Sequence, residues 1–134
     1  MQISEQVITL EQAKKLKELW FKKESLYVFV EWWKIWQPTK SEIHLTEIMK
    51  NRICLADSAY SLYQAYTVSE LMEYLPEYIW DYYIGVFKDY TQYCCHYVEV
   101  ENNTTLHQSR NDNLAQALWD VLIYLISNNY MECN

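Results

Sequence analysis

The tripeptide Cys94-Cys95-His96 carries the residue types that bind zinc or form a thiolate nucleophile. On a strand, Cys94 and His96 point to one face and Cys95 to the other, because successive side chains alternate. Two ligands only begin a zinc site, and His44 or Cys54 would have to help complete the set of four. Neighbours that face apart disfavour a Cys–His nucleophile. The simpler interpretation is that both cysteines are small buried residues of a core strand.

Carboxylates could support a second chemistry, metal-dependent hydrolysis, because Mg²⁺ prefers oxygen ligands. Four of them lie in or near one expected hairpin: Asp81, Asp89, Glu99 and Glu101. No lysine follows them at a useful spacing, and the acidic surroundings would repel a nucleic-acid substrate. The alternative is that these carboxylates belong to a solvated sheet edge or turn.

Motifs for nucleophilic catalysis and for phosphate binding are missing from the sequence. His107, Ser109 and Asp112 are triad residue types, but no nucleophile elbow accompanies them. The chain holds one glycine, Gly85, which excludes Gly-rich phosphate loops and dinucleotide fingerprints. We therefore predict no catalytic residue, no cofactor and no metal site, and a small metal-dependent enzyme stays a second alternative.

Tyrosines and carboxylates interleave in the second half of the chain, and this composition suits the binding of Arg and Lys through ion pairs and cation–π contacts. Residues 67–134 hold ten acidic and two basic residues, and the whole chain has a net charge of −7. The pattern predicts a basic protein partner and disfavours direct nucleic-acid binding. The alternative is an ordinary acidic face that aids solubility. The candidate contact residues are Glu70, Glu73, Tyr74, Glu77, Tyr78, Asp81, Tyr83, Asp89 and Tyr90.

Three tryptophans, Trp32, Trp33 and Trp36, lie within five residues. In an extended segment, Trp32 and Trp33 point opposite ways and Trp36 sides with Trp32. One face would then present an aromatic surface that suits a partner interface, including a homodimer through this strand. The alternative is a strand buried between a helix layer and a long loop.

The N-terminal residues have no apolar signal core, and no stretch approaches the roughly 20 apolar residues of a membrane span. The four cysteines include no C-x-x-C pair and are most simply free thiols of a reducing compartment. The length of 134 residues suits one domain. We therefore expect a single α+β domain, residues 1–134, that is cytoplasmic and binds no membrane.

Helix signals occur in three places. The capping boxes Thr9-Leu-Glu-Gln12 and Thr67-Val-Ser-Glu70 predict helix N-termini, with apolar residues at helical spacing after each box. A proline ends the second helix after about two turns. A third apolar stripe predicts a helix that Asn111 or Asp112 caps and that runs to about Ser127.

Strand signals are the β-branched and aromatic run 26–36, the alternating run 43–49, and a hairpin formed by 79–88 and 91–100. Trp80, Tyr82, Ile84 and Val86 should share one face of that hairpin. Hairpins without βαβ crossovers favour a small antiparallel sheet of about four to five strands, covered on one face by two to three helices. We expect loops at 37–41 and 101–109, while residues 50–66 have no clean period.

Three segments resemble a group of short proteins without established activity, encoded in Bacteroidota genomes and in their phages and mobile elements. They are LEQAKKLKELWF at 10–21, TVSELMEYLP at 67–76 and NLAQALWDVLIYLISNNY at 113–130. Members often carry Gly where this chain has Trp20, which makes the geometry of that helix end a question for the structure. The resemblance implies a mobile-element origin and a bacterial host cytoplasm, and it supplies no catalytic residues.

Together these observations favour a non-enzymatic protein-binding module. Its concrete form is a small inhibitor of anti-CRISPR or anti-restriction type that docks the acidic, Tyr-rich surface on a basic host nuclease or other nucleic-acid-handling protein. A structural or self-assembling protein that dimerises through the Trp-rich strand is the alternative.

Overall fold

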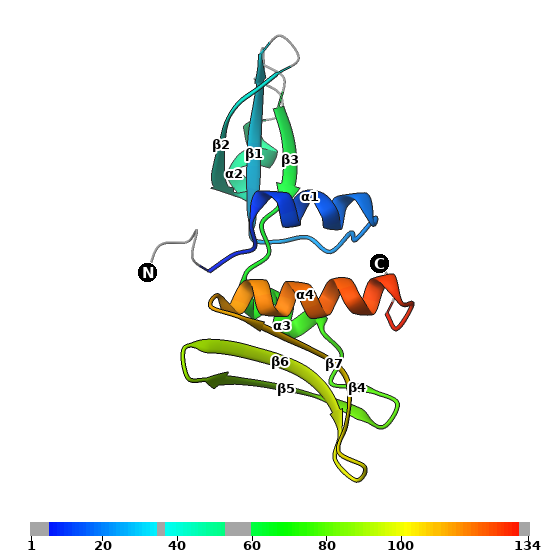
Figure 1. Ribbon diagram of the computed structural model, residues 1–134. Coiled ribbons are helices and arrows are strands. Elements are labelled where there is room, and N and C mark those ends of the chain that lie inside the picture. Colours follow the sequence, from blue (N-terminus) through cyan, green and yellow to red (C-terminus); the bar gives the residue numbers. More distant parts are fainter. Residues whose placement is uncertain (1–5, 35–36, 53–59, 132–134) are drawn as a thin grey trace.

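A computed structural model describes residues 6–34, 37–52 and 60–131. Over these residues the chain forms an α+β fold with two antiparallel sheets, one of three and one of four strands, and four helices. The predicted fold class is confirmed. The single sheet that we expected is instead two sheets, with helices between them (Figure 1).

The first sheet is built from β1 (Tyr27–Lys34), β2 (Gln37–Leu45) and β3 (Tyr60–Gln64), in the order β2-β1-β3. The helix α2 (Thr46–Arg52) follows β2 directly. The predicted loop at 37–41 is wrong, because β2 pairs with β1 from Gln37 onwards. Pro38 lies opposite Trp33, beside a register shift. An edge strand tolerates proline at such an irregularity, since one side of its backbone has no partner.

The predicted strand 43–49 ends early, at Leu45. Thr46 begins α2 and is fixed there, because its Oγ1 donates to the Ser25 carbonyl at 2.6 Å. Met49 then packs from α2 against Val28 and Val30 in a small core of the first sheet. Seven residues are too few for the apolar period to separate a strand from a short helix.

The second sheet has the order β4-β5-β6-β7, with β4 at Tyr78–Ile79, β5 at Tyr82–Asp89, β6 at Gln92–Glu99 and β7 at Thr104–Asn111. The β5–β6 hairpin confirms the prediction. The loop expected at 101–109 is wrong, because its polar residues form β7. An edge strand presents one flank and part of its face to water, so it does not need an apolar sequence.

Three helices carry the main core. The predicted capping boxes are present at α1 (Leu10–Glu18) and α3 (Val68–Tyr74). The C-terminal helix α4 spans Leu114–Ser127, and its N-cap is Asn113 instead of Asn111 or Asp112. Asn111 contributes indirectly, because its Oδ1 accepts a hydrogen bond from the Asn113 amide at 2.9 Å.

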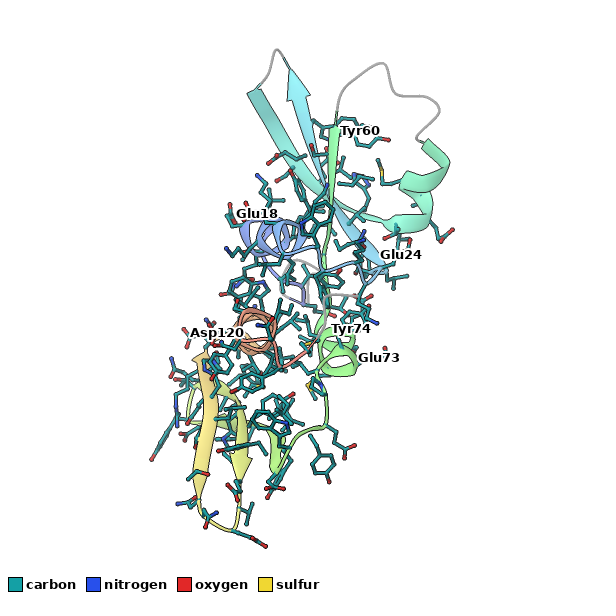
Figure 2. All side chains as sticks on the ribbon, turned by 90° about the vertical axis from the view of Figure 1, so that its right-hand side faces the viewer. Glu18, Glu24, Tyr60, Glu73, Tyr74 and Asp120 are labelled. Carbon is teal, nitrogen blue, oxygen red and sulfur yellow. The ribbon has the colours of Figure 1, made fainter. Side chains whose placement is uncertain are left out.

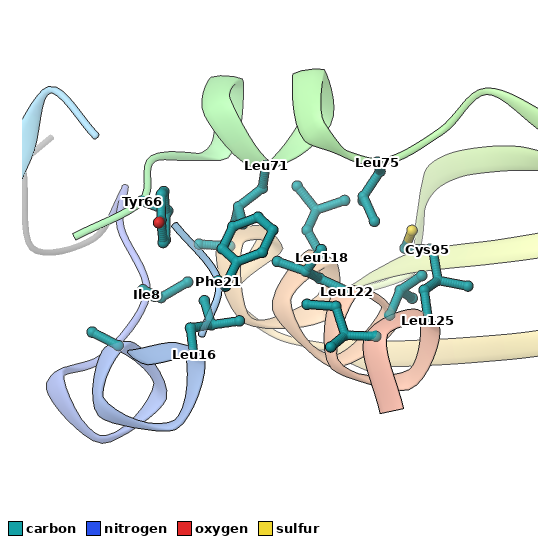
Figure 3. Packing of buried hydrophobic residues seen from close by; sticks show 14 of the residues in the cluster. Ile8, Leu16, Phe21, Tyr66, Leu71, Leu75, Cys95, Leu118, Leu122 and Leu125 are labelled. Atoms are coloured by element: carbon teal, nitrogen blue, oxygen red, sulfur yellow. The ribbon is translucent and has the colours of Figure 1, made fainter. Parts of the chain in front are cut away.

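The helix α4 is the centre of the core. Its buried side chains, among them Leu118, Leu122 and Leu125, contact α3 and α1 on one side and Cys95 of β6 on another (Figure 3). Trp119 of α4 also donates from Nε1 to the Gln12 carbonyl of α1. The helices therefore cover one face of the second sheet, as predicted, and the other face is left to solvent, where Phe87 is 41% exposed.

Both long helices end in the same backbone motif. After α1, the Phe21 amide bonds the Leu16 carbonyl at 3.0 Å and the Trp20 amide bonds the Lys17 carbonyl at 3.1 Å. After α4, Tyr130 and Asn129 make the equivalent bonds to Leu125 and Ile126. These are Schellman motifs, whose C′ residue takes a left-handed conformation. Trp20, with φ 61°, thus adopts the left-handed conformation that Gly adopts most easily, and the Schellman motif forms without Gly.

Candidate protein-binding groove

A groove of about 470 Å³ lies where the C-terminal ends of α3 and α4 meet β4. We call it the aromatic groove. Its walls come from the end of α3, from β4, from the turn between β4 and β5, and from the residues after α4. The lining residues are Lys23, Tyr74, Pro76, Tyr78, Ile79, Trp80, Asn129, Tyr130 and Met131.

Trp80 forms one wall of the aromatic groove and is held in a left-handed backbone conformation, with φ 54°. We predicted that Trp80 shares one face with Tyr82 and Ile84. This prediction is wrong, because residues 80–81 form the turn that leads into β5. Its side chain is 77% exposed, and its ring meets the Tyr130 ring edge-on at 5.5 Å. A bulky residue rarely adopts this backbone region, and core packing does not explain an exposed side chain.

Tyr130 connects Trp80 to a row of stacked rings. The Tyr130 ring lies 6.0 Å from the Tyr124 ring at 22°, and Tyr124 stacks on His107 at 4.0 Å and 8°. His107 of β7 pairs in turn with Asp120 of α4, Nε2 to Oδ2, at 3.0 Å. These contacts support the Tyr130 side of the groove from the underlying sheet and helix.

Tyr74 forms the opposite wall and is rigidly placed. Its ring packs edge-on against Phe21 and Tyr66, and its hydroxyl donates to the Glu24 carbonyl at 3.0 Å. Burial raises the pKa of Tyr74, and Glu70 and then Glu73 and Glu24 raise it further. The wall therefore stays a neutral aromatic surface. Tyr78 is 62% exposed and extends this surface towards Tyr83.

Carboxylates flank the aromatic groove. Glu73 and Glu77 are exposed next to Tyr74 and Tyr78, and Asp81 is exposed next to Trp80. Within the described part of the chain, these three side chains make no hydrogen bond or ion pair, so they are available to a ligand. Figure 2 shows Glu73, Tyr74 and Glu24 on one side of the molecule and Asp120 on the other. Lys23 is the cation among the described lining residues.

Glu70 has a structural role instead of the surface role that we predicted. Its carboxylate accepts hydrogen bonds from Ser25 Oγ at 2.7 Å, from the Leu26 amide at 2.9 Å and from the Thr67 amide at 2.9 Å. It therefore closes the capping box of α3 and ties α3 to the start of β1 at the same time. With both oxygens engaged, Glu70 is a poor contact for a partner.

The remaining residues of the predicted acidic surface lie elsewhere. Asp89 pairs with Arg110 at 2.8 Å, and Tyr90 is 96% exposed at the tip of the β5–β6 hairpin. The length of β5 separates this tip from Trp80, which is about 25 Å at the usual strand rise. Apart from Glu70, the candidates thus lie either at or next to the aromatic groove or at the hairpin tip, with Tyr83 beside Tyr78.

The Trp-rich strand is not an edge. From Val28 to Trp32, β1 pairs with β2 on one side and β3 on the other, so its backbone cannot add another strand there. Trp32 is half-buried, and its ring lies 5.5 Å from the Tyr60 ring. Trp33 pairs with Pro38 through its backbone, and Trp36 lies outside the described residues.

The Cys-Cys-His segment lies in β6 with both cysteines buried. Burial raises the pKa of the Cys95 thiol to about 12, so the nucleophilic thiolate is scarce at neutral pH. His96 packs against Phe87 at 5.2 Å, and burial lowers its pKa. Across the described residues, no three side chains of Cys, His, Asp or Glu gather in a way that could hold a metal ion. Cys54 lies outside those residues.

The carboxylates considered for Mg²⁺ are not brought together at the aromatic groove. Asp89 is paired with Arg110, while Glu99 accepts hydrogen bonds from Asn102 and Thr104 at the β6–β7 turn. Of the triad residue types, Ser109 is buried in β7 and His107 pairs with Asp120 instead of Asp112.

Sequence reasoning missed Lys23, Trp80 and Tyr130 as groove residues. A useful signal existed for Tyr130, because Asn128-Asn129 after an apolar stripe is typical of a helix C-terminus and places the next residue against the last turn. For Trp80 the turn carries neither Gly nor Pro, so no local signal marked it.

No family model, no curated protein and no solved structure gives a significant match to this chain. Among the helices that the structure describes, none is long and apolar enough to cross a membrane.

Proposed function

We propose that this chain is a non-enzymatic protein-binding module that holds a basic segment of its partner in the aromatic groove. The observation that carries the proposal is Trp80, which is 77% exposed in a left-handed backbone conformation and shares the groove with Tyr74, Tyr78 and Tyr130. A cluster of exposed aromatic side chains suits a recognition site, and the hydrophobic core has no use for it.

The chemistry of the groove suits arginine above other side chains. A guanidinium group stacks on aromatic faces and forms paired hydrogen bonds with carboxylates at the same time. Each cation–π contact contributes about 0.5–2 kcal/mol, depending on how dry the site becomes. Glu73, Glu77 and Asp81 supply the carboxylates. Because these side chains make no ion pair within the described part of the chain, they can form ion pairs with a partner.

The partner class follows from the charge of the molecule. Residues 67–134 carry ten acidic and two basic residues, so a basic protein surface would be attracted over a long range. Nucleic-acid-handling proteins present such surfaces. With the mobile-element resemblance, this supports an inhibitor of anti-CRISPR or anti-restriction type that acts in the cytoplasm of a bacterial host.

Fluorescence polarisation with a labelled Arg-Ser repeat peptide tests the proposal. We expect E73Q/E77Q/D81N to weaken peptide binding about tenfold, as the loss of three exposed ion pairs implies. The control E99Q/E101Q/D112N removes the same charge away from the groove and should bind nearly as the parent does. Equal losses in both variants would mean that overall charge, and not the aromatic groove, attracts the peptide.

Self-association stays a second candidate, but at a different place from the one predicted. Because β1 is internal, the uncovered face of the second sheet replaces it, with Tyr78, Tyr83 and Phe87 exposed there. Sedimentation velocity over a hundredfold concentration range would show a dimer that F87E disrupts if this second candidate holds, and a monomer throughout if it does not.

A further inference from the structure

A second recess, separate from the aromatic groove, lies between α1 and β3. It has a volume of about 320 Å³, and its floor is apolar. Leu16 and Tyr66 are each 1% exposed and Phe21 is 5% exposed, so these core side chains lie under the recess with almost no surface open to it (Figure 3), whereas Leu62 is partly exposed. A pocket of this size lies at the small end of the range of roughly 300–1,000 Å³ that is usual for small-molecule sites.

The rim of this recess is cationic, and we call it the lysine recess. Lys17, Lys22 and Lys23 line it, and no carboxylate appears among the described lining residues. The rim is thus positively charged, although the whole chain has a net charge of −7. Lys17 is held in place, because its Nζ donates to the Leu62 carbonyl at 3.0 Å and lies 4.7 Å from the centre of the Tyr63 ring.

Two backbone carbonyls and one carboxylate close to the recess have hydrogen-bond donors of their own. The Leu16 and Lys17 carbonyls accept from Phe21 and Trp20 in the Schellman motif. The Glu70 carboxylate accepts hydrogen bonds from Ser25, Leu26 and Thr67. The described lining of the recess thus holds three lysines and no carboxylate, and Lys22 Nζ lies 5.8 Å from the centre of the Trp20 ring.

Gln64 adds a polar donor to the lining. Its Oε1 accepts from the Ser25 amide at 2.7 Å, which fixes the orientation of the side-chain amide. Its NH₂ group donates no hydrogen bond within the part of the chain that the structure describes. An amide donor and lysines around a buried apolar floor are complementary to a molecule with an apolar body and an anionic head.

We propose that the lysine recess binds a small amphipathic organic anion, with its apolar body against Leu62 and the lysine stems and its carboxylate, phosphate or sulfonate at the ammonium groups of the rim. The proposal does not rest on the proposed protein-binding function, although Lys23 also lines the aromatic groove. Free metabolites and the ends of acyl chains share this chemistry.

The test uses two fluorescent probes that differ by one group. 1-Anilinonaphthalene-8-sulfonate carries the anion, and N-phenyl-1-naphthylamine has the same rings without it. We expect the sulfonate to bind with one-to-one stoichiometry and the neutral probe to bind at least about tenfold more weakly, because the ammonium groups contribute only to the anion. Sodium decanoate should displace the sulfonate, and benzenesulfonate displacing it better would identify a ring-shaped ligand instead of an acyl chain.

Two charge-reversal variants assign the binding to this recess. K17E/K22E, at two lysines that line this recess and not the aromatic groove, should lower the affinity for the sulfonate probe about tenfold or more. K15E/K88E changes the net charge equally, but neither residue lines the recess, so this control should keep the parent affinity. As a second test, L62W fills the recess and should abolish binding of both probes, with circular dichroism confirming the fold. Equal affinity for the two probes, or equal effects of the two charge reversals, would overturn the proposal.

Discussion

At the scale of single residues, two exposed tryptophans have a left-handed backbone conformation, and the reason for this conformation differs between them. Trp20 occupies the C′ position of the Schellman motif after α1, with φ 61°, while Trp80 lies in a turn at the aromatic groove. The Trp20 conformation is required by the helix end. The Trp80 conformation is required by the turn that brings its ring to Tyr130.

The helix-end requirement gives a stability prediction. Replacing Trp20 by Gly should raise the free energy of unfolding by about 1 kcal/mol, because Gly adopts a positive φ without the Cβ penalty. Trp20→Ala keeps a Cβ and should give little or none of this gain. Urea unfolding of both variants checks the prediction, and equal effects of Gly and Ala would show that the gain does not come from the backbone.

Glu70 gives a second prediction at this scale. Glu70→Ala removes the acceptor for Ser25, Leu26 and Thr67, so we expect a loss of about 1–3 kcal/mol in unfolding free energy. Glu70→Gln keeps one acceptor oxygen and should lose less. Because Glu70 is not a groove residue, peptide affinity of the folded variants should stay within twofold, which is about 0.4 kcal/mol.

Three buried acids define the expected pH dependence. Burial raises the pKa of Cys95 to about 12 and also raises the pKa values of Tyr66 and Tyr97 above their ordinary range. In the unfolded chain these groups ionise from about pH 9–10. The native state then binds more protons than the unfolded state, so stability is full below pH 9 and falls as the pH rises towards 12.

Urea unfolding at pH 8, 9, 10 and 11 measures this dependence. Each group contributes a slope of at most about 1.4 kcal/mol per pH unit. Cys95→Ala should flatten the curve between pH 9 and pH 10, where the unfolded thiol ionises first. An unchanged slope in that variant would show that Cys95 does not titrate as its burial implies.

At the scale of elements, local signals located the helices better than the strands. The two capping boxes and the stripe of α4 are short-range patterns, and they were confirmed because the same hydrogen bonds form in any tertiary context. β7 was missed because an edge strand takes its structure from pairing with β6, which its own polar sequence does not reveal. α2 was missed because Thr46 is fixed by a distant residue, Ser25.

The pairing of β5 with β6 requires the only glycine of the chain. Gly85 lies opposite His96, and a Cβ at Gly85 would approach His96 Nε2 to 2.5 Å and Cδ2 to 2.8 Å. Gly85→Ala should therefore destabilise the protein by about 1–3 kcal/mol, since the ring must move away from Phe87. The double variant G85A/H96A should recover part of this loss in a thermal unfolding experiment. No recovery would mean that strain elsewhere causes the loss.

At the scale of the whole molecule, the helices α1 and α4 lie between the two sheets and end on the same side (Figure 1). This arrangement brings the aromatic groove together from Lys23, from the end of α3, from β4 and its following turn, and from the chain after α4. Composition predicted an acidic, Tyr-rich surface, and of its residues Tyr74 and Tyr78 line the groove, while Glu73, Glu77 and Asp81 are exposed next to lining residues in the sequence. It could not predict the other wall, because Trp80 and Tyr130 meet only through packing across about 50 residues of sequence.

The molecule therefore presents two recesses of opposite character, which share Lys23. The lysine recess has a cationic rim over an apolar floor, whereas the aromatic groove has aromatic walls, and the exposed carboxylates Glu73, Glu77 and Asp81 are sequence neighbours of its lining residues. We infer that the two take ligands of opposite charge.

The most direct test of the account compares Trp80→Ala with Trp20→Ala in the Arg-Ser peptide assay. The two side chains are similarly exposed, 77% and 73%, and both have positive φ, but only Trp80 lines the aromatic groove. We predict that Trp80→Ala weakens peptide binding about fivefold to twentyfold, as the loss of a cation–π contact implies, while Trp20→Ala leaves it unchanged. Unchanged binding in Trp80→Ala, or an equal loss in both variants, would contradict the aromatic groove as the binding site.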